Sequence, residues 1–172
     1  MRALFLLLIG IFYSVMLEAA TPPKGIIVQD GRMAPTIRLK NLDGDDFDLS
    51  KVEKKWKFVH FWASWCGPCR KEMPTIQEIS TQLGSDKWQI VLINTAEDED
   101  TVFSFASIVT PDLIPLLDKD GVISEQWQPR GLPSTYLVDP ENKIRFIALG
   151  GRPWNEIEYL NFLRELAAPK TP

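Results

Sequence analysis

The apolar positions near the start of the chain alternate with polar ones, which is the period of a half-buried strand. Residues 37–39 and 47–49 carry this pattern on either side of the turn sequence Asp43-Gly44. The pattern predicts an N-terminal β-hairpin. Two further runs, 56–62 and 89–94, are apolar at most positions and predict central strands that are buried on both faces.

Apolar residues at three- and four-residue spacing predict helices beside these strands. One helix should run from Pro68 to about Gly84, with a kink at Pro74. A second should open at the acidic run 97–100, because negative charges suit the first turn of a helix. Residues 113–117 form another short apolar stretch, which ends at a turn.

The last part of the chain predicts a short helix near residues 125–127 and then two strands, 136–138 and 144–148. A terminal amphipathic helix should follow, and its apolar residues are Trp154, Ile157, Leu160, Leu163 and Leu166. Strands that alternate with helices and end in a late hairpin predict an α/β fold, in which helices flank a mixed central β-sheet.

The first twenty residues have the parts of a secretory signal: Arg2, an apolar run over residues 3–17, and small residues at its end. We expect residues 1–20 to be a signal peptide or a signal anchor and residues 21–172 to form one domain. Fifteen helical residues reach about 22 Å, whereas the hydrocarbon core of a bilayer is roughly 30 Å thick. Export to the periplasm with cleavage is therefore favoured, and inner-membrane anchoring by residues 3–17 is the alternative.

The charge of the chain argues against a nucleic-acid partner. The net charge is −4 and the isoelectric point is near 5.1, whereas phosphate binding needs clustered lysine and arginine.

Cysteine usage points to chemistry rather than to structural cross-linking. The chain has only two cysteines, Cys66 and Cys69. A bridge across two intervening residues constrains the unfolded chain little, so stabilisation is a weak reason for it. Structural zinc takes four ligands, and His60 is the one histidine, so no metal site is expected. The pair is predicted to be a redox-active dithiol that needs no cofactor.

Thiol–disulfide exchange needs one thiolate that attacks and a second thiol that resolves the mixed disulfide. The pair opens the predicted helix, where free N–H groups and the helix dipole stabilise an anion on the first cysteine. Cys66 is therefore predicted to be the exposed nucleophile, and Cys69, one turn into the helix, the buried resolving thiol. Pro68 has the fixed φ that an early helical position accepts.

Three segments resemble a known family. Residues 61–70, Phe-Trp-Ala-Ser-Trp-Cys-Gly-Pro-Cys-Arg, look like the active-site segment of thioredoxin-fold proteins. Residues 70–74 resemble the TlpA/ResA branch, and residues 131–139 are similar to its cis-proline loop. The resemblance implies a thioredoxin-like fold with an N-terminal hairpin, and the activity of an exported thiol:disulfide oxidoreductase. This branch includes reductases of cytochrome c maturation.

The resemblance also implies roles for single residues. Pro133 would be a cis-proline packed against the cysteines, and Leu132 would pair through its backbone with an extended substrate segment. Glu72 matches an acidic residue close to the active cysteines and would exchange a proton with Cys69 if it is buried. The alternative for Glu72 is an exposed helix carboxylate that forms surface ion pairs.

His60 departs from the family pattern, since thioredoxins place a buried acid there. It is either a proton shuttle or a hydrogen-bonded core histidine. Trp65, Gly67 and Pro68 flank the cysteines and are expected to belong to the substrate-binding surface.

The resemblance implies protein disulfides as substrates and a membrane thiol-transfer protein as electron donor. A periplasmic oxidase or isomerase uses the same chemistry, so the direction of electron flow stays open. Two other classes fit less well. A peroxiredoxin-type peroxidase needs Thr or Ser where Ala63 stands, and a copper-delivery module uses a wider cysteine spacing with a distant histidine.

Overall fold

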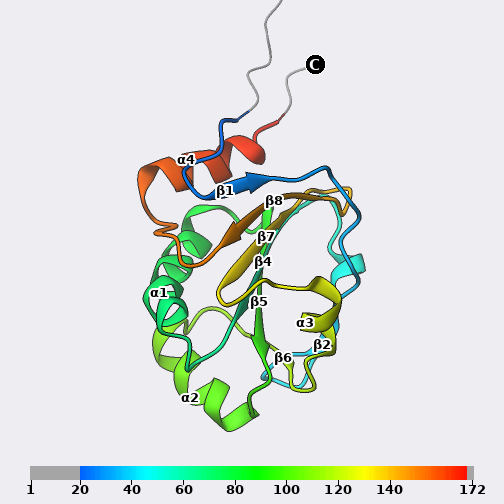
Figure 1. Ribbon diagram of the computed structural model, residues 1–172, viewed down its shortest axis with the longest axis vertical. Coiled ribbons are helices and arrows are strands. Elements are labelled where there is room, and N and C mark those ends of the chain that lie inside the picture. The colour runs from blue at the N-terminus through cyan, green and yellow to red at the C-terminus, as the bar shows by residue number, and fades with distance from the viewer. Residues whose placement is uncertain (1–19, 170–172) are drawn as a thin grey trace, which may run out of the picture.

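The computed structural model describes residues 20–169, so the predicted signal segment lies, apart from Ala20, outside the described residues. The described chain is built around one six-stranded sheet (Figure 1). In sheet order the strands are β1 (Ile26–Val28), β8 (Ile144–Leu149), β7 (Ser134–Val138), β4 (Trp56–Trp62), β5 (Trp88–Thr95) and β6 (Leu116–Asp118). β4, β5 and β6 are parallel and the other pairs are antiparallel, so the sheet is mixed, as predicted.

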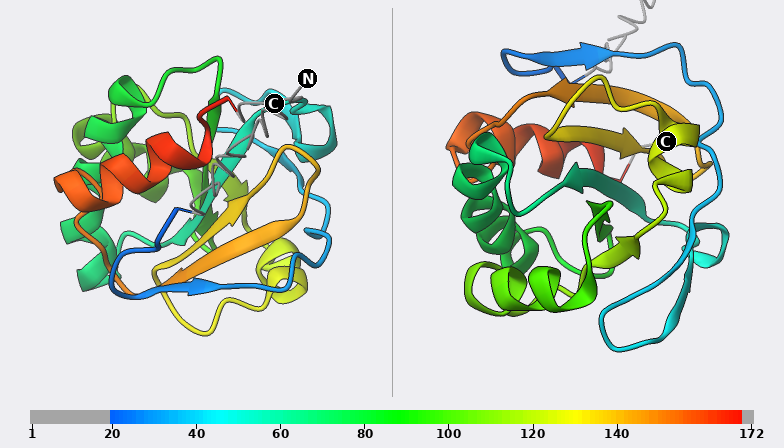
Figure 2. Two further views of the ribbon diagram at one scale, coloured as in Figure 1. Left: turned by 90° about the horizontal axis from the view of Figure 1, so that it is seen from above. Right: turned by 60° about the horizontal axis from the view of Figure 1, so that its bottom comes forward.

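Helices cover both faces of this sheet (Figure 2). One face packs against α1 (Gly67–Gln82), α2 (Glu99–Val109) and α4 (Ile157–Leu166). The other face packs against α3 (Val122–Trp127) and the N-terminal hairpin of β2 (Arg38–Lys40) and β3 (Asp46–Asp48), with a 3-10 turn at Leu49–Lys51. The predicted thioredoxin-like arrangement and its hairpin are confirmed.

Strand β4 shows how the sequence pattern builds two cores. Phe58 and Trp62 lie in the cluster that includes the helix α1, whereas Val59 and Phe61 lie in the cluster that includes α3. Successive side chains of a strand point to opposite faces, so a strand in the middle of the sheet needs apolar residues at both. β4 therefore carries buried residues at nearly every position.

Some details differ from the sequence prediction. β1 was not predicted, because it has only three residues, two of them exposed, and pairs only with β8. α1, by contrast, matches the prediction, because it includes Pro74 and ends just before Gly84, whose φ of 73° is left-handed. Trp154 precedes the terminal helix instead of belonging to it, and Ile157, at the start of that helix, is 67% exposed.

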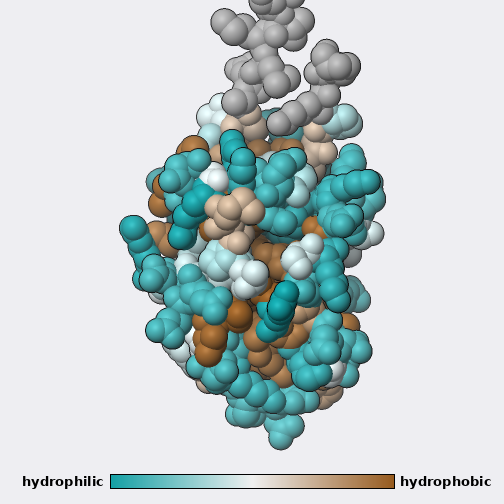
Figure 3. Space-filling view, turned by 90° about the vertical axis from the view of Figure 1, so that its right-hand side faces the viewer, coloured by the Kyte–Doolittle hydropathy of each residue, from teal (hydrophilic) through white to brown (hydrophobic). Residues whose placement is uncertain are grey.

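The surface of the described part is mostly polar. On the side where α3 and β2 lie, polar side chains surround an apolar area in the lower half of the view (Figure 3). Between residues 20 and 169, no helix combines the length and the apolar character that crossing a bilayer requires.

Candidate active site

The two cysteines lie at the junction between the end of β4 and the first turn of α1. Cys66 is the N-cap of α1, with extended backbone, and its Sγ lies 3.2 Å from the backbone N of Cys69. The two residues form a disulfide with their Cα atoms 5.2 Å apart. The helix N-terminus thus stands at the first sulfur, where its N–H groups stabilise a thiolate once the bridge is reduced. This position was predicted.

The exposure of the pair follows the predicted order but not the predicted extent. Cys69 is fully buried and Cys66 is 4% exposed, so in the disulfide state the expected exposed nucleophile is almost covered. The neighbours of Cys66 are accessible: Trp65 is 70% exposed, and Gly67 and Pro68 are exposed as well. A partner therefore meets these three residues before it meets the sulfur.

The predicted cis-proline is present, since the Leu132–Pro133 peptide bond is cis. Pro133 is buried and directly precedes β7. Ser134, the first residue of β7, pairs with Phe61 of β4. The proline therefore stands at the end of β4 from which the cysteine segment leaves. The carbonyl of Pro133 accepts a hydrogen bond from Gly150 N (2.8 Å), and Leu132 is half-buried beside it.

Glu72 lies in the interior, on the same face of α1 as Cys69. It is 2% exposed, so the alternative of an exposed helix carboxylate is wrong. Its Oε1 accepts a hydrogen bond from Trp154 Nε1, and its Oε2 has no partner within residues 20–169. Burial raises the pKa of Glu72 to about 8, although the bond from Trp154 and the backbone and charge of Arg152 oppose this rise. Glu72 is therefore mainly protonated at neutral pH.

Sequence reasoning missed Trp154 as part of this site. Its side chain is fully buried and packs edge-on against Phe58 (centroids 4.8 Å apart) and Tyr159 (5.7 Å). Its backbone N donates to Thr75 Oγ1 of α1 (3.3 Å). Trp154 and Glu72 are 82 positions apart, so no local pattern indicates their contact.

His60 is fully buried in β4, where its Nδ1 lies 2.9 Å from Thr135 Oγ1 of β7. Its Nε2 has no partner in the described part of the chain. Burial lowers the pKa of His60 to about 3, so the ring is neutral over the physiological range. The geometry favours the core-histidine alternative over the proton shuttle.

A second carboxylate, that of Glu97, holds the segment before Cys66, although sequence reasoning assigned it to the start of a helix. Glu97 was expected in the first turn of a helix, but α2 begins at Glu99 with Asp98 as its N-cap. Glu97 instead accepts hydrogen bonds from Ser64 N (2.7 Å), from Ser64 Oγ and from Asn94 Nδ2 (2.6 Å). β4 and β5 are parallel and end at the same edge of the sheet, which is the signal that could have indicated this contact.

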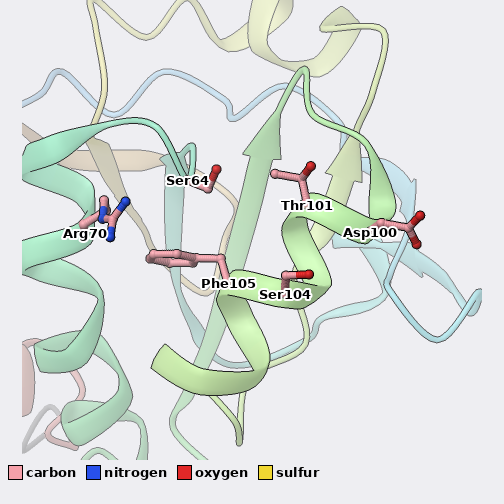
Figure 4. Close-up of a pocket in the computed structure, with 6 residues that line it drawn as sticks. All are labelled: Ser64, Arg70, Asp100, Thr101, Ser104 and Phe105. Atoms are coloured by element: carbon pink, nitrogen blue, oxygen red, sulfur yellow. The ribbon is translucent and has the colours of Figure 1, made fainter.

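A groove of about 430 Å³ adjoins the active-site segment; its lining residues are Ser64, Arg70, Asp100, Thr101, Ser104 and Phe105. Figure 4 shows Arg70 of α1 directed toward Phe105 of α2. The guanidinium Cζ lies 5.9 Å from the ring centroid, within the range of a cation–π contact.

Together these groups can carry out thiol–disulfide exchange. The bridge stands at a helix N-terminus, which stabilises the thiolate of the first cysteine. A buried carboxyl group that is protonated at neutral pH lies on the same helix face as the second cysteine, where it can supply a proton to a leaving thiolate.

Comparison with known proteins gives the same picture. The model of the AhpC/TSA family matches residues 31–147. The chain is 32% identical to the thioredoxin-like protein YneN of Bacillus subtilis over 138 residues, 78% of this chain and 80% of that protein. It is 28% identical to the thiol-disulfide oxidoreductase ResA of the same organism, over 80% and 77% of the two chains. Among solved structures, the thioredoxin domain of a thiol-disulfide oxidoreductase from Bacteroides vulgatus superimposes with a TM-score of 0.71 at 26% identity, covering 83% of this chain and all of that one.

Proposed function

This chain belongs to the AhpC/TSA family as a thioredoxin-like, TlpA/ResA-type thiol–disulfide oxidoreductase, and we propose that it acts as an exported reductase of protein disulfides. The observation that carries the proposal is the Cys66–Cys69 pair at the N-terminus of α1, with the buried carboxyl group of Glu72 one turn further on.

The reductive cycle uses both cysteines. The Cys66 thiolate attacks one sulfur of the substrate disulfide, which breaks that bond, forms a mixed disulfide and releases the first substrate thiolate. Cys69 then loses its proton and attacks Cys66 Sγ, which closes the Cys66–Cys69 bridge and releases the second substrate thiolate. Two electrons pass from the dithiol to the substrate, and the two released thiolates each take up a proton.

The cycle is completed by a donor dithiol, and Glu72 serves this half of the reaction. A donor thiolate attacks Cys66, so Cys69 leaves as a thiolate in a nearly dry interior. The protonated carboxyl of Glu72 supplies the proton that Cys69 needs. The second donor thiolate then attacks the donor sulfur of the mixed disulfide, which breaks its bond to Cys66 and releases the Cys66 thiolate and the donor as a disulfide. When Cys69 later acts as a nucleophile, the Glu72 carboxylate takes its proton back.

The substrate side is formed by the exposed surface around the pair. Trp65, Gly67 and Pro68 are accessible, and an extended substrate segment can pair with the backbone of Leu132 beside the cis-proline. The TlpA/ResA resemblance supports apocytochrome c or another envelope protein as substrate, and a membrane thiol-transfer protein as donor. Residues 1–20 would export the chain to the periplasm or, through residues 3–17, anchor it to the inner membrane.

The test is a redox titration of the protein in graded glutathione or dithiothreitol buffers, read by tryptophan fluorescence, with Cys66→Ser as control. We expect a reversible two-electron transition with a midpoint near or below about −250 mV, as for thioredoxin-like reductants. A midpoint near about −120 mV would reverse the direction of electron flow and make the protein an oxidase. The absence of a transition would overturn the redox function.

A further inference from the structure

The Glu72 carboxyl group has two oxygens in different surroundings. Oε1 accepts the hydrogen bond from Trp154 Nε1, whereas Oε2 has no partner between residues 20 and 169. Trp154 is itself fixed, because its ring packs between Phe58 and Tyr159 and its backbone N is bonded to Thr75. One oxygen of the carboxyl is therefore held by a rigid donor.

The free oxygen lies beside the turn that carries the cysteines. A Cβ atom placed on Gly151 would lie 3.7 Å from Glu72 Oε2 and 3.4 Å from the carbonyl oxygen of Pro68. Oε2 and Pro68, which stands between the two cysteines, thus flank the same point. Gly151 is exposed, so the point that Oε2 and Pro68 flank lies near the surface.

We propose that Trp154 is a positioning residue, which holds Glu72 Oε1 and thereby leaves Oε2 free to exchange the proton of Cys69. The inference rests on the proposed role of Glu72 in the redox cycle. Trp154 lies in the segment between β8 and α4, so this segment contributes to the reaction although it carries no reacting group. Without the indole N–H, the carboxyl group would lose the bond that holds Oε1 and keeps Oε2 on the side of Pro68.

Other ionisable groups around Glu72 are few in the described part of the chain. Arg152, in the same segment as Trp154, lowers the pKa of Glu72 through its charge and its nearby backbone N–H, although that N–H forms no hydrogen bond with Oε2. Tyr159 of α4 packs edge-on against the indole of Trp154, and His60 of β4 stacks on Phe58. Cys66 and Cys69 themselves titrate only when reduced, so the disulfide form isolates Glu72 from them.

The first test measures Glu72 directly in the disulfide form of the full chain, by NMR of ¹³C-labelled glutamate carboxyl groups. The Glu72 signal is assigned by its loss in Glu72→Gln. In Trp154→Phe, the midpoint of this signal should rise by about one pH unit, the equivalent of one lost hydrogen bond to a charged group. The matched control is Trp127→Phe, because Trp127 is also fully buried but its indole N–H has no partner within residues 20–169. An unchanged midpoint in Trp154→Phe, or an equal rise in the control, would overturn the inference.

A second measurement needs no substitution at Trp154 and so does not depend on whether Trp154→Phe folds. The indole N–H signal of Trp154 should shift with pH at the same midpoint as the Glu72 carboxyl, and this shift should vanish in Glu72→Gln. A Trp154 signal that ignores the ionisation of Glu72 would contradict the proposed contact.

The link to the reaction is tested by the rate at which dithiothreitol reduces the Cys66–Cys69 bridge. The ratio of this rate to the rate for Glu72→Gln should fall as pH rises through the Glu72 midpoint. In Trp154→Phe the ratio should fall at a higher pH, shifted by as much as the NMR midpoint. A ratio that does not change with pH would refute the proton transfer. If the NMR coupling is present but no reversible redox transition exists, the proposed function fails while the Trp154–Glu72 contact stands.

Discussion

Replacing Glu72 by glutamine should change how the stability of the disulfide form depends on pH. The ordinary pKa of a glutamate is 4.5, and burial raises that of Glu72 to about 8 in the folded protein. Between these two values the folded state binds one more proton than the unfolded chain, so the free energy of unfolding falls as pH rises. Each pH unit corresponds to about 1.4 kcal/mol, so the gap between 4.5 and about 8 corresponds to roughly 5 kcal/mol, an order-of-magnitude value. Glu72→Gln cannot ionise and should lack this loss.

His60 contributes with the opposite sign over part of the same range. Its pKa is about 3 when folded and 6.5 when free, so it makes the free energy of unfolding rise with pH from about 3 to 6.5. The decline caused by Glu72 is therefore clearest between pH 6.5 and 8.

The assay is urea denaturation of the disulfide form at half-unit steps from pH 5 to pH 9, followed by circular dichroism. The wild type should lose stability from pH 6.5 to 8 and then level off, whereas Glu72→Gln should stay nearly flat there and exceed the wild type at pH 8.5. Glu165→Gln, at an exposed position of α4, is the matched control and should follow the wild type. If Glu72→Gln declined as steeply as the wild type, the buried, protonated carboxyl would not be the cause.

Three further results are expected. His60→Gln should reduce the gain in the free energy of unfolding between about pH 3 and 4.5 and reveal the decline caused by Glu72 from pH 4.5 to 6.5, as measured by urea denaturation extended down to pH 3. A profile below pH 6.5 that matches the wild type would contradict the buried neutral ring. Glu97→Ala should lower the free energy of unfolding, measured by urea denaturation, by about 2 kcal/mol, because Ser64 and Asn94 lose a shared acceptor. Glu97→Gln should recover part of this loss. An alanine variant as stable as the wild type would refute the contact. Trp65→Ala should change the free energy of unfolding by no more than about 0.5 kcal/mol. It should lower kcat/KM for a protein disulfide by roughly tenfold and leave the rate with oxidised glutathione unchanged. Equal losses with both substrates would show that Trp65 does not bind the protein partner.

Much of the fold follows from local pattern. β4 occupies the predicted residues 56–62, because its apolar run is long and is preceded by charged residues. β1 escaped prediction because its three residues gain their place only by pairing with β8, more than a hundred positions away. Trp154 was assigned to the terminal helix on spacing alone, whereas its contacts with Phe58 and Glu72 place it in the loop before that helix.

The residues of the site likewise divide into those that a local motif indicates and those whose state depends on distant parts of the chain. The cysteines and the cis-proline carry a motif, so the sequence indicated them directly. The state of Glu72 could be stated only as a condition on burial, since the burial comes from elements distant in the chain. Glu97 showed a different failure, because acidic residues do suit a helix start, and Asp98 fills that place one position later. The carboxylate of Glu97 was thereby left for Ser64, a contact that depends on how β4 and β5 lie together.

The central claim is that Cys66 attacks a disulfide and Cys69 resolves it. The most direct test mixes reduced Cys69→Ser with a protein that holds an accessible disulfide and analyses the products by non-reducing electrophoresis and mass spectrometry. The account predicts a mixed disulfide through Cys66 that accumulates and is released by dithiothreitol, and little or none with Cys66→Ser. An adduct that forms through Cys69 in Cys66→Ser, or none with either variant, would contradict it.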